Sequence, residues 1–138
     1  MLMPRFALFA LLLPTLAVAK PVHVAVVLDT GKDLRTHKVV DAAADFLARL
    51  GGDPGDLAGA WEIAAPGEPI APMTSMIGAD KTFAVSTVRG VRTRRAKREL
   101  AVAIDTAGEY ITALSGIRAV RAVVLIAGPD SGPPGTLE

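Results

Sequence analysis

The sequence predicts an α/β protein with an open, mostly parallel, Rossmann-like sheet of about four strands and helices on the sheet's faces. Two observations lead to this fold class. Apolar, β-branched runs occur near both ends of the chain, at residues 22–28 and 119–127. Helical patterns also alternate with strand patterns between these runs. This order favours an open α/β sheet over a helix bundle or a β-barrel.

The first strand is expected at residues 22–28, where an almost unbroken apolar run is typical of a central parallel strand. Turn residues at 29–33 end this strand. Between residues 39 and 50, apolar side chains recur at three- and four-residue steps, which predicts an amphipathic helix that ends at Gly51 and Gly52. Strand, turn and helix together form the first half of a βαβ unit.

A second strand is expected at residues 57–64, followed by a turn and a short return strand at 70–73. The prolines of this return strand exclude a central position and suit the edge of a hairpin. Two alternatives stay open for residues 75–93, because 82–88 fits either a strand or a loop that leads into a helix.

The pattern between residues 94 and 115 predicts a long helix with one apolar stripe. Gly108 lies inside that helix, where it would permit close contact between helix and sheet. The run at 119–127 predicts a last strand of the buried type, and the Pro/Gly tail at 133–138 continues no element.

The first 19 residues have the layout of a secretory signal peptide. One cation, Arg5, precedes an apolar run, and small residues stand at 17–19, so cleavage is expected before Lys20. The apolar run is much shorter than the ~20 residues that span a bilayer. We therefore expect a secreted or periplasmic domain over residues 20–132, with no membrane association after cleavage.

Composition excludes several function classes. The absence of cysteine excludes a disulfide scaffold, a zinc ribbon and a thiol nucleophile. A net charge of +1 and an aromatic content of 4% argue against a nucleic-acid-binding protein. Two histidines at no ligand spacing, and the lack of a Gly-x-Ser-x-Gly motif, leave no catalytic constellation.

Two segments resemble a known family. The strand end and turn at residues 26–31 (Val-Val-Leu-Asp-Thr-Gly) and the helix at 38–47 are similar to the opening of von Willebrand factor A-type domains. The resemblance is closest to the secreted bacterial branch, in which a step like Pro-Met-Thr-Ser at 72–75 follows the edge strand. It extends over about residues 22–132 and depends on pattern more than on motif.

The resemblance implies a site for a divalent cation, which the family holds with an Asp-x-Ser-x-Ser motif, a distant Thr and a distant Asp. Asp29 matches the motif, but Gly31 and Asp33 replace its serines. The residues that would carry such a site are Asp29, Asp33, Thr93 and Asp130, with Thr87 as the alternative to Thr93. We expect the site to be degenerate and no cofactor to be needed, with Mg²⁺ or Ca²⁺ as the ions that it would take. The other interpretation makes Asp29 and Asp33 turn and helix-capping residues.

Six cations lie between residues 89 and 98. They have two interpretations, a solvated helix start or a contact for an anionic partner. Because cations oppose the dipole at a helix start, they are not there to stabilise the helix. The residues proposed for the contact are Arg92, Arg94, Arg95 and Arg98.

The function expected is an exported, non-enzymatic protein-interaction module with a degenerate metal site and an unidentified protein partner. One alternative is a small exported hydrolase that uses Asp29 and Asp33, and another is a truncated product without independent function. Domains of the resembled family continue for two further strands and helices. Without them, the last strand becomes a sheet edge that invites a partner.

Overall fold

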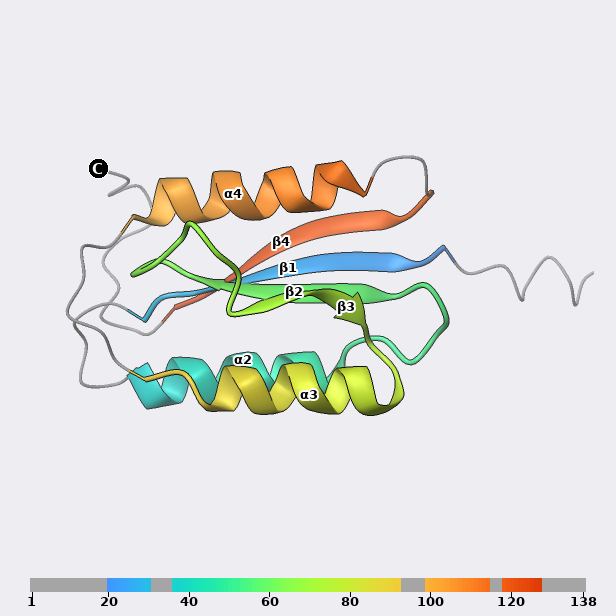
Figure 1. Cartoon of the computed structure of the whole chain (residues 1–138), viewed down its shortest axis with the longest axis horizontal. Helices are drawn as coiled ribbons and strands as arrows, with labels where there is room; N and C mark the ends of the chain where they lie inside the picture. Colours follow the sequence, from blue (N-terminus) through green and yellow to red (C-terminus); the bar gives the residue numbers. More distant parts are fainter. Residues whose placement is uncertain (1–19, 31–35, 93–98, 115–117, 128–138) are drawn as a thin grey trace, which may run out of the picture.

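The computed structural model describes residues 20–30, 36–92, 99–114 and 118–127, and it confirms the predicted fold class. The described residues form one four-stranded sheet in the order β3-β2-β1-β4, with α4 over one face and α2 and α3 over the other (Figure 1). The elements are β1 (Val22–Leu28), α2 (Thr36–Arg49), β2 (Leu57–Glu62), β3 (Ala71–Ser75), α3 (Gly78–Arg89), α4 (Leu100–Ala113) and β4 (Val120–Ile126).

Strand β1 lies at the centre of the sheet, as its apolar sequence predicts. It pairs in parallel with β2 on one side and with β4 on the other, so that Val26 lies between Ala60 and Val124. Every residue of β1 after Val22 is buried. The predicted neighbourhood of the first and last strands is therefore confirmed.

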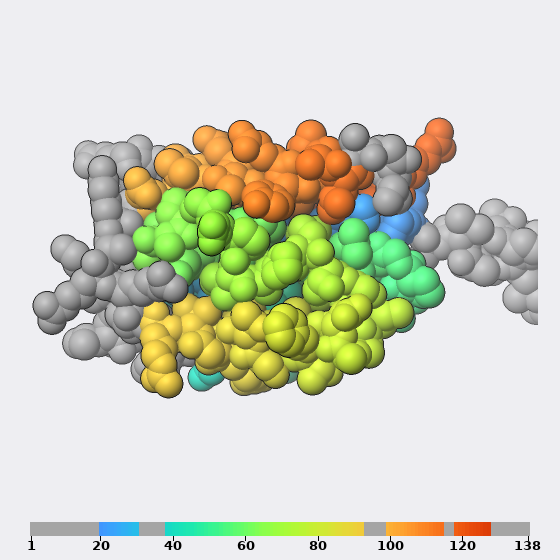
Figure 2. Space-filling view, in the orientation of Figure 1, coloured from blue at the N-terminus to red at the C-terminus, as the bar shows by residue number. Residues whose placement is uncertain are grey.

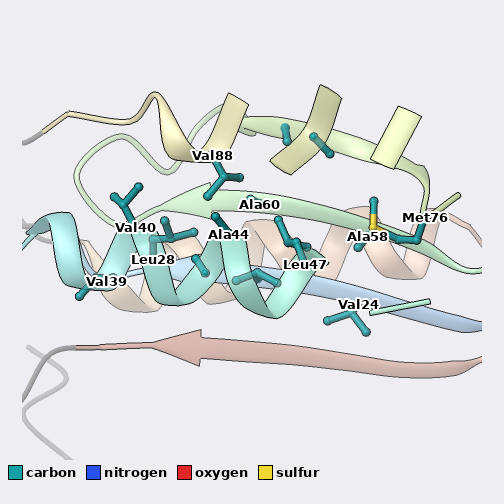
Figure 3. Packing of buried hydrophobic residues seen from close by; sticks show 14 residues of the cluster. Val24, Leu28, Val39, Val40, Ala44, Leu47, Ala58, Ala60, Met76 and Val88 are labelled. Atoms are coloured by element: carbon teal, nitrogen blue, oxygen red, sulfur yellow. The ribbon is translucent and has the colours of Figure 1, made fainter. Parts of the chain in front are cut away.

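Helix α2 covers one face of the sheet because its apolar residues recur at helical spacing. Val40, Ala44 and Leu47 pack against Val24 and Leu28 of β1 in the larger of two apolar cores (Figure 3). The helix ends where the sequence predicts, before Gly51 and Gly52, whose φ angles are 78° and 113°. Residues that carry a side chain rarely adopt positive φ angles, so glycine suits the end of this helix.

Helix α4 covers the opposite face with a narrower stripe. Ala103, Ala107 and Ile111 are buried against Ala25 and Val27 of β1, and Trp61 and Ile63 complete this second core. The ring of Tyr110 lies 5.2 Å from that of Trp61, between centroids, at 57°. This tilted arrangement is favourable for two aromatic rings. The contact joins α4, which carries Tyr110, to β2, which carries Trp61.

The predicted edge hairpin is confirmed. Strand β3 pairs antiparallel with β2 and has exposed Pro72 within it. The register shifts between Ala58 and Ala60, and Gly59 stands at the shift. A Cβ on Gly59 would lie 3.0 Å from both the Ala71 carbonyl oxygen and the Met73 nitrogen. Glycine therefore permits the close approach of β3. The Pro-Met-Thr-Ser step at 72–75 lies inside this strand rather than after it.

Residues Gly78–Arg89 form helix α3, so both alternatives for residues 82–88, a strand and a loop that leads into a helix, are wrong. Only Ala84 and Val88 of this helix are buried, and Phe83 is exposed. Helix α3 packs beside α2 and β3, and Arg89 of α3 forms an ion pair with Asp45 of α2 at 2.9 Å. The thin apolar stripe explains why the periodicity was ambiguous.

Two further expectations are wrong. Strand β4 is not a buried strand: it lies at the edge of the described sheet, and its residues alternate between exposed and half-buried. Among the described helices only α4 covers this face, and its buried residues pack against β1 and Trp61, so Val123 and Leu125 stay exposed. Gly108 does not permit close helix–sheet contact either, because a Cβ placed there would have no atom within 4 Å.

Candidate functional site at the carboxyl ends of the strands

The carboxyl ends of the parallel strands are joined by backbone hydrogen bonds beyond the sheet. The Asp29 N–H donates to the Ile126 carbonyl oxygen at 3.0 Å, which links the end of β1 to that of β4. The Ile63 N–H donates to the Leu28 carbonyl oxygen at 3.1 Å, which links β1 to β2. Open α/β sheets bind their ligands outside this edge, where the chain leaves the strands in opposite directions.

Three polar side chains are buried at this edge. Thr30 is fully buried, and its hydroxyl donates a 3.0 Å hydrogen bond to Oε2 of Glu62. Glu62 is 3% exposed and Asp29 is 7% exposed. A buried carboxylate requires hydrogen-bonded partners, and Thr30 supplies one to Glu62. The edge therefore carries two buried acids in fixed positions.

A cavity of about 570 Å³ adjoins Glu62, between the β2–β3 connection and the carboxyl-terminal end of α3. In the space-filling view, the green surface of that connection lies next to the yellow end of α3 (Figure 2). The lining residues are Glu62, Ala65, Glu68, Pro69, Ile70, Ser86, Thr87, Gly90, Val91 and Arg92. The lining combines acidic, hydroxyl, basic and apolar groups.

Two arginines near this cavity differ in their partners. The Arg89 guanidinium lies 2.9 Å from the Asp45 carboxylate. Arg92 lines the cavity, is exposed, and makes no ion pair with any carboxylate in the described part of the chain. An anion that enters the cavity would thus meet Arg92 without displacing an intramolecular carboxylate among the described residues.

Most of the site residues expected from the sequence lie outside the described residues. Asp33, Thr93, Asp130, Arg94, Arg95 and Arg98 belong to this group. Asp29 is placed at the expected edge, and Arg92 lines the cavity. Thr87, the alternative hydroxyl, also lines the cavity, but its Oγ1 donates to the Phe83 carbonyl oxygen within α3 at 2.8 Å.

The described residues do not make the cation site that the family resemblance implies. No group of three or more His, Asp or Glu side chains in the described ranges is placed to hold a metal ion. We therefore derive no chemistry through a metal at this edge.

His23 does not supply a catalytic base at this edge, and the hydroxyl that donates to Glu62 belongs to Thr30, which is fully buried. His23 is the buried histidine of β1, and it lies near the amino end of that strand, away from Asp29. Neither of its ring nitrogens has a hydrogen-bond partner among the described residues. Buried Asp56 also lies at the amino edge, where it accepts hydrogen bonds from the backbone N–H groups of Val22 and Asp53. Asp56 thus holds the start of β1 against the turn before β2.

Sequence reasoning missed Thr30 and Glu62. A signal for Glu62 was present, because a single carboxylate near the end of an otherwise apolar second strand falls at the same sheet edge as Asp29. For Thr30 the sequence offers no such signal, because its position after the first strand indicates only a turn residue. The pair depends on the register in which Leu28 lies opposite Glu62, and that register requires the paired strands.

No protein-family model matches the sequence, and neither a curated protein nor a solved structure matches it. No helix within the described ranges has the length and apolar character needed to cross a membrane. The fold and the site thus define an α/β open-sheet domain with a polar, partly buried site at the carboxyl edge of its sheet.

Proposed function

We propose that this chain is an exported, non-enzymatic protein-interaction module, and that it binds its partner at the carboxyl edge of the sheet. The observation that carries the proposal is Arg92, an exposed cation without a described carboxylate partner at a cavity of about 570 Å³. The partner presents an acidic side chain, which enters the cavity and binds the Arg92 guanidinium.

The chemistry of the cavity supports this mode of binding. A guanidinium binds a carboxylate through paired N–H donors, and such charge-assisted bonds are among the stronger ones in proteins. Pro69, Ile70 and Val91 supply apolar surface beside the charge, while Glu62 and Glu68 repel an anion that is placed wrongly. Like-charge repulsion of this kind selects the orientation of the partner.

Export is part of the proposal, and it depends on the signal layout of residues 1–19. Mass spectrometry of the chain purified from the periplasm or medium of an exporting host tests it. A mature amino terminus at Lys20 supports export with cleavage, whereas an intact chain retained in the cytoplasm contradicts it.

The binding proposal is tested by photo-crosslinking in the exporting cell. A photoreactive residue replaces Ser86, which is exposed and lines the cavity, and a matched one replaces exposed Asp41 on α2, away from the cavity. We expect a protein adduct from position 86 that is absent from position 41 and is lost when Arg92→Glu is added. Equal adducts from both positions, or an adduct unaffected by Arg92→Glu, contradict the proposal.

The hydrolase alternative has its own outcome. Turnover of ester or phosphate model substrates that is abolished by Asp29→Asn would show that the protein is an enzyme and would contradict the proposed interaction module. We expect no such turnover, because the hydroxyl that donates to Glu62 belongs to Thr30, which is fully buried and closed to a substrate.

A further inference from the structure

We propose that two copies of this chain form a symmetric dimer by antiparallel pairing of their β4 strands, centred on Val123. The pairing joins two four-stranded sheets into one continuous sheet. It uses the edge of the sheet along β4 rather than the carboxyl ends of the strands. It is therefore independent of the partner site proposed above.

The backbone of β4 offers hydrogen-bonding groups to such a partner. The Val120 N–H donates to the Pro21 carbonyl oxygen, and the Ile126 carbonyl oxygen accepts from the Asp29 N–H. The even-numbered residues of β4 thus direct their backbone groups toward β1. Because successive residues of a strand alternate, Arg121, Val123 and Leu125 direct theirs away from the described sheet.

The two edges of the sheet are built differently. Edge strand β3 is five residues long, contains Pro72 and pairs with β2 across a register shift. Short strands, prolines and bulges are the features that prevent further strand pairing. Strand β4 has seven residues, no proline, and a single charge at Arg121. Only the β4 edge therefore lacks this protection.

The sequence of β4 complements itself in one register. With Val123 opposite Val123 of the second copy, Arg121 faces Leu125 and Val120 faces Ile126. The large exposed apolar residues of β4 are Val120 (53% exposed), Val123 (38%) and Leu125 (43%). Each of them thus gains an apolar side chain or the aliphatic stem of arginine as its neighbour. The same patch serves both copies, as a two-fold interface requires.

Charge does not oppose this pairing. In the proposed register the two Arg121 side chains face leucines instead of each other. Each guanidinium also donates to the Leu114 carbonyl oxygen of its own chain at 3.3 Å, which draws it toward the end of α4. The whole chain carries a net charge of only +1, and proteins near neutrality repel their own copies weakly.

Sedimentation equilibrium of the protein purified from the exporting host tests the dimer. We expect twice the mass of one chain for the wild type. Val123→Lys places two ammonium groups face to face and should raise the dissociation constant by about tenfold or more. Val123→Pro removes an outward N–H without breaking the pairing with β1 and should act in the same direction. Circular dichroism verifies that both variants remain folded.

Val102→Lys is the matched control, because Val102 is an exposed valine on α4 and outside the proposed interface. It should leave the dimer intact. A wild type that sediments as one chain at all concentrations overturns the proposal, and this result is also expected if another segment of the chain covers β4. A dimer that both Val123 variants retain overturns it as well.

Crosslinking tests the register. The chain has no cysteine, so Val123→Cys introduces its only thiol. Directly paired residues lie ~5.5 Å apart between Cα atoms, within the range that a disulfide spans. On mild oxidation, we expect Val123→Cys to form a covalent dimer and Val102→Cys to remain monomeric. Denaturing electrophoresis under non-reducing conditions distinguishes the two. Equal crosslinking of the two variants contradicts the register.

Discussion

The Thr30 hydroxyl donates a 3.0 Å hydrogen bond to the Glu62 carboxylate, and both residues are buried where β1 and β2 end. The bond joins side chains that are 32 residues apart in the sequence. It fixes the position of an acid next to the cavity that we propose as the partner site.

Removal of this bond should destabilise the fold. We expect Thr30→Val to lower the free energy of unfolding by about 1–3 kcal/mol, because it leaves a buried carboxylate oxygen without that donor. Urea unfolding of Thr30→Val, Glu62→Gln and the double variant gives the coupling between the two side chains. A coupling of about 1 kcal/mol or more is expected, and additive effects would show that the bond contributes nothing to stability.

Two glycines should respond to alanine in opposite directions. A Cβ on Gly59 would press on the backbone of β3, so Gly59→Ala should lower the free energy of unfolding by about 1–3 kcal/mol. Gly108 lies in α4 with no atom within 4 Å of such a Cβ, so Gly108→Ala should raise it by up to about 1 kcal/mol. Thermal unfolding measures both, and a stabilising Gly59→Ala would refute the close approach of β3.

His23 should be replaceable by an apolar residue with a gain in stability. Its ring nitrogens are buried without partners among the described residues, and an unpaired buried polar group is unfavourable. We expect His23→Leu to raise the free energy of unfolding by about 1 kcal/mol. Fluorescence of Trp61, the only tryptophan, follows the transition. The polar control His23→Gln should give no gain, and equal gains from both variants would contradict this explanation.

Titration with Mg²⁺ or Ca²⁺ should give no saturable heat in calorimetry. The family's motif has serines two and four residues after its aspartate, whereas this chain has Gly31 and Asp33 at those positions. Saturable binding that Asp29→Ala abolishes, and that Asp41→Ala on the exposed face of α2 leaves intact, would instead establish a cation site.

Periodicity predicted the parts of the fold that have a dominant apolar pattern. Strand β1 is buried on both faces, and the apolar residues of α2 cover one of them. Each element could therefore be predicted from its own local pattern. Helix α3 buries only Ala84 and Val88, too few to establish a period. Strand β4 has the apolar sequence of a central strand, yet it lies at an edge. Its position depends on how many strands and helices surround it, which a local pattern does not contain.

The sequence predicted only the part of the candidate site that depends on a single residue at the end of a single strand. Asp29 could be placed because it ends the first apolar run. Glu62 and Thr30 form a site only through the parallel register of β1 and β2. The cavity at Arg92 requires α3 to run beside the β2–β3 connection, and the sequence left the structure of that segment open.

The affinity of the crosslinked partner for charge-reversed variants tests the proposed function most directly. Arg92→Glu and Arg49→Glu make the same change on exposed arginines, but Arg49 ends α2 and lies outside the cavity. We expect Arg92→Glu to weaken binding by about tenfold or more, as the loss of a charge-assisted hydrogen bond does, and Arg49→Glu to leave it unchanged. Equal affinities for the wild type and Arg92→Glu would contradict the assignment of this edge as the interaction surface.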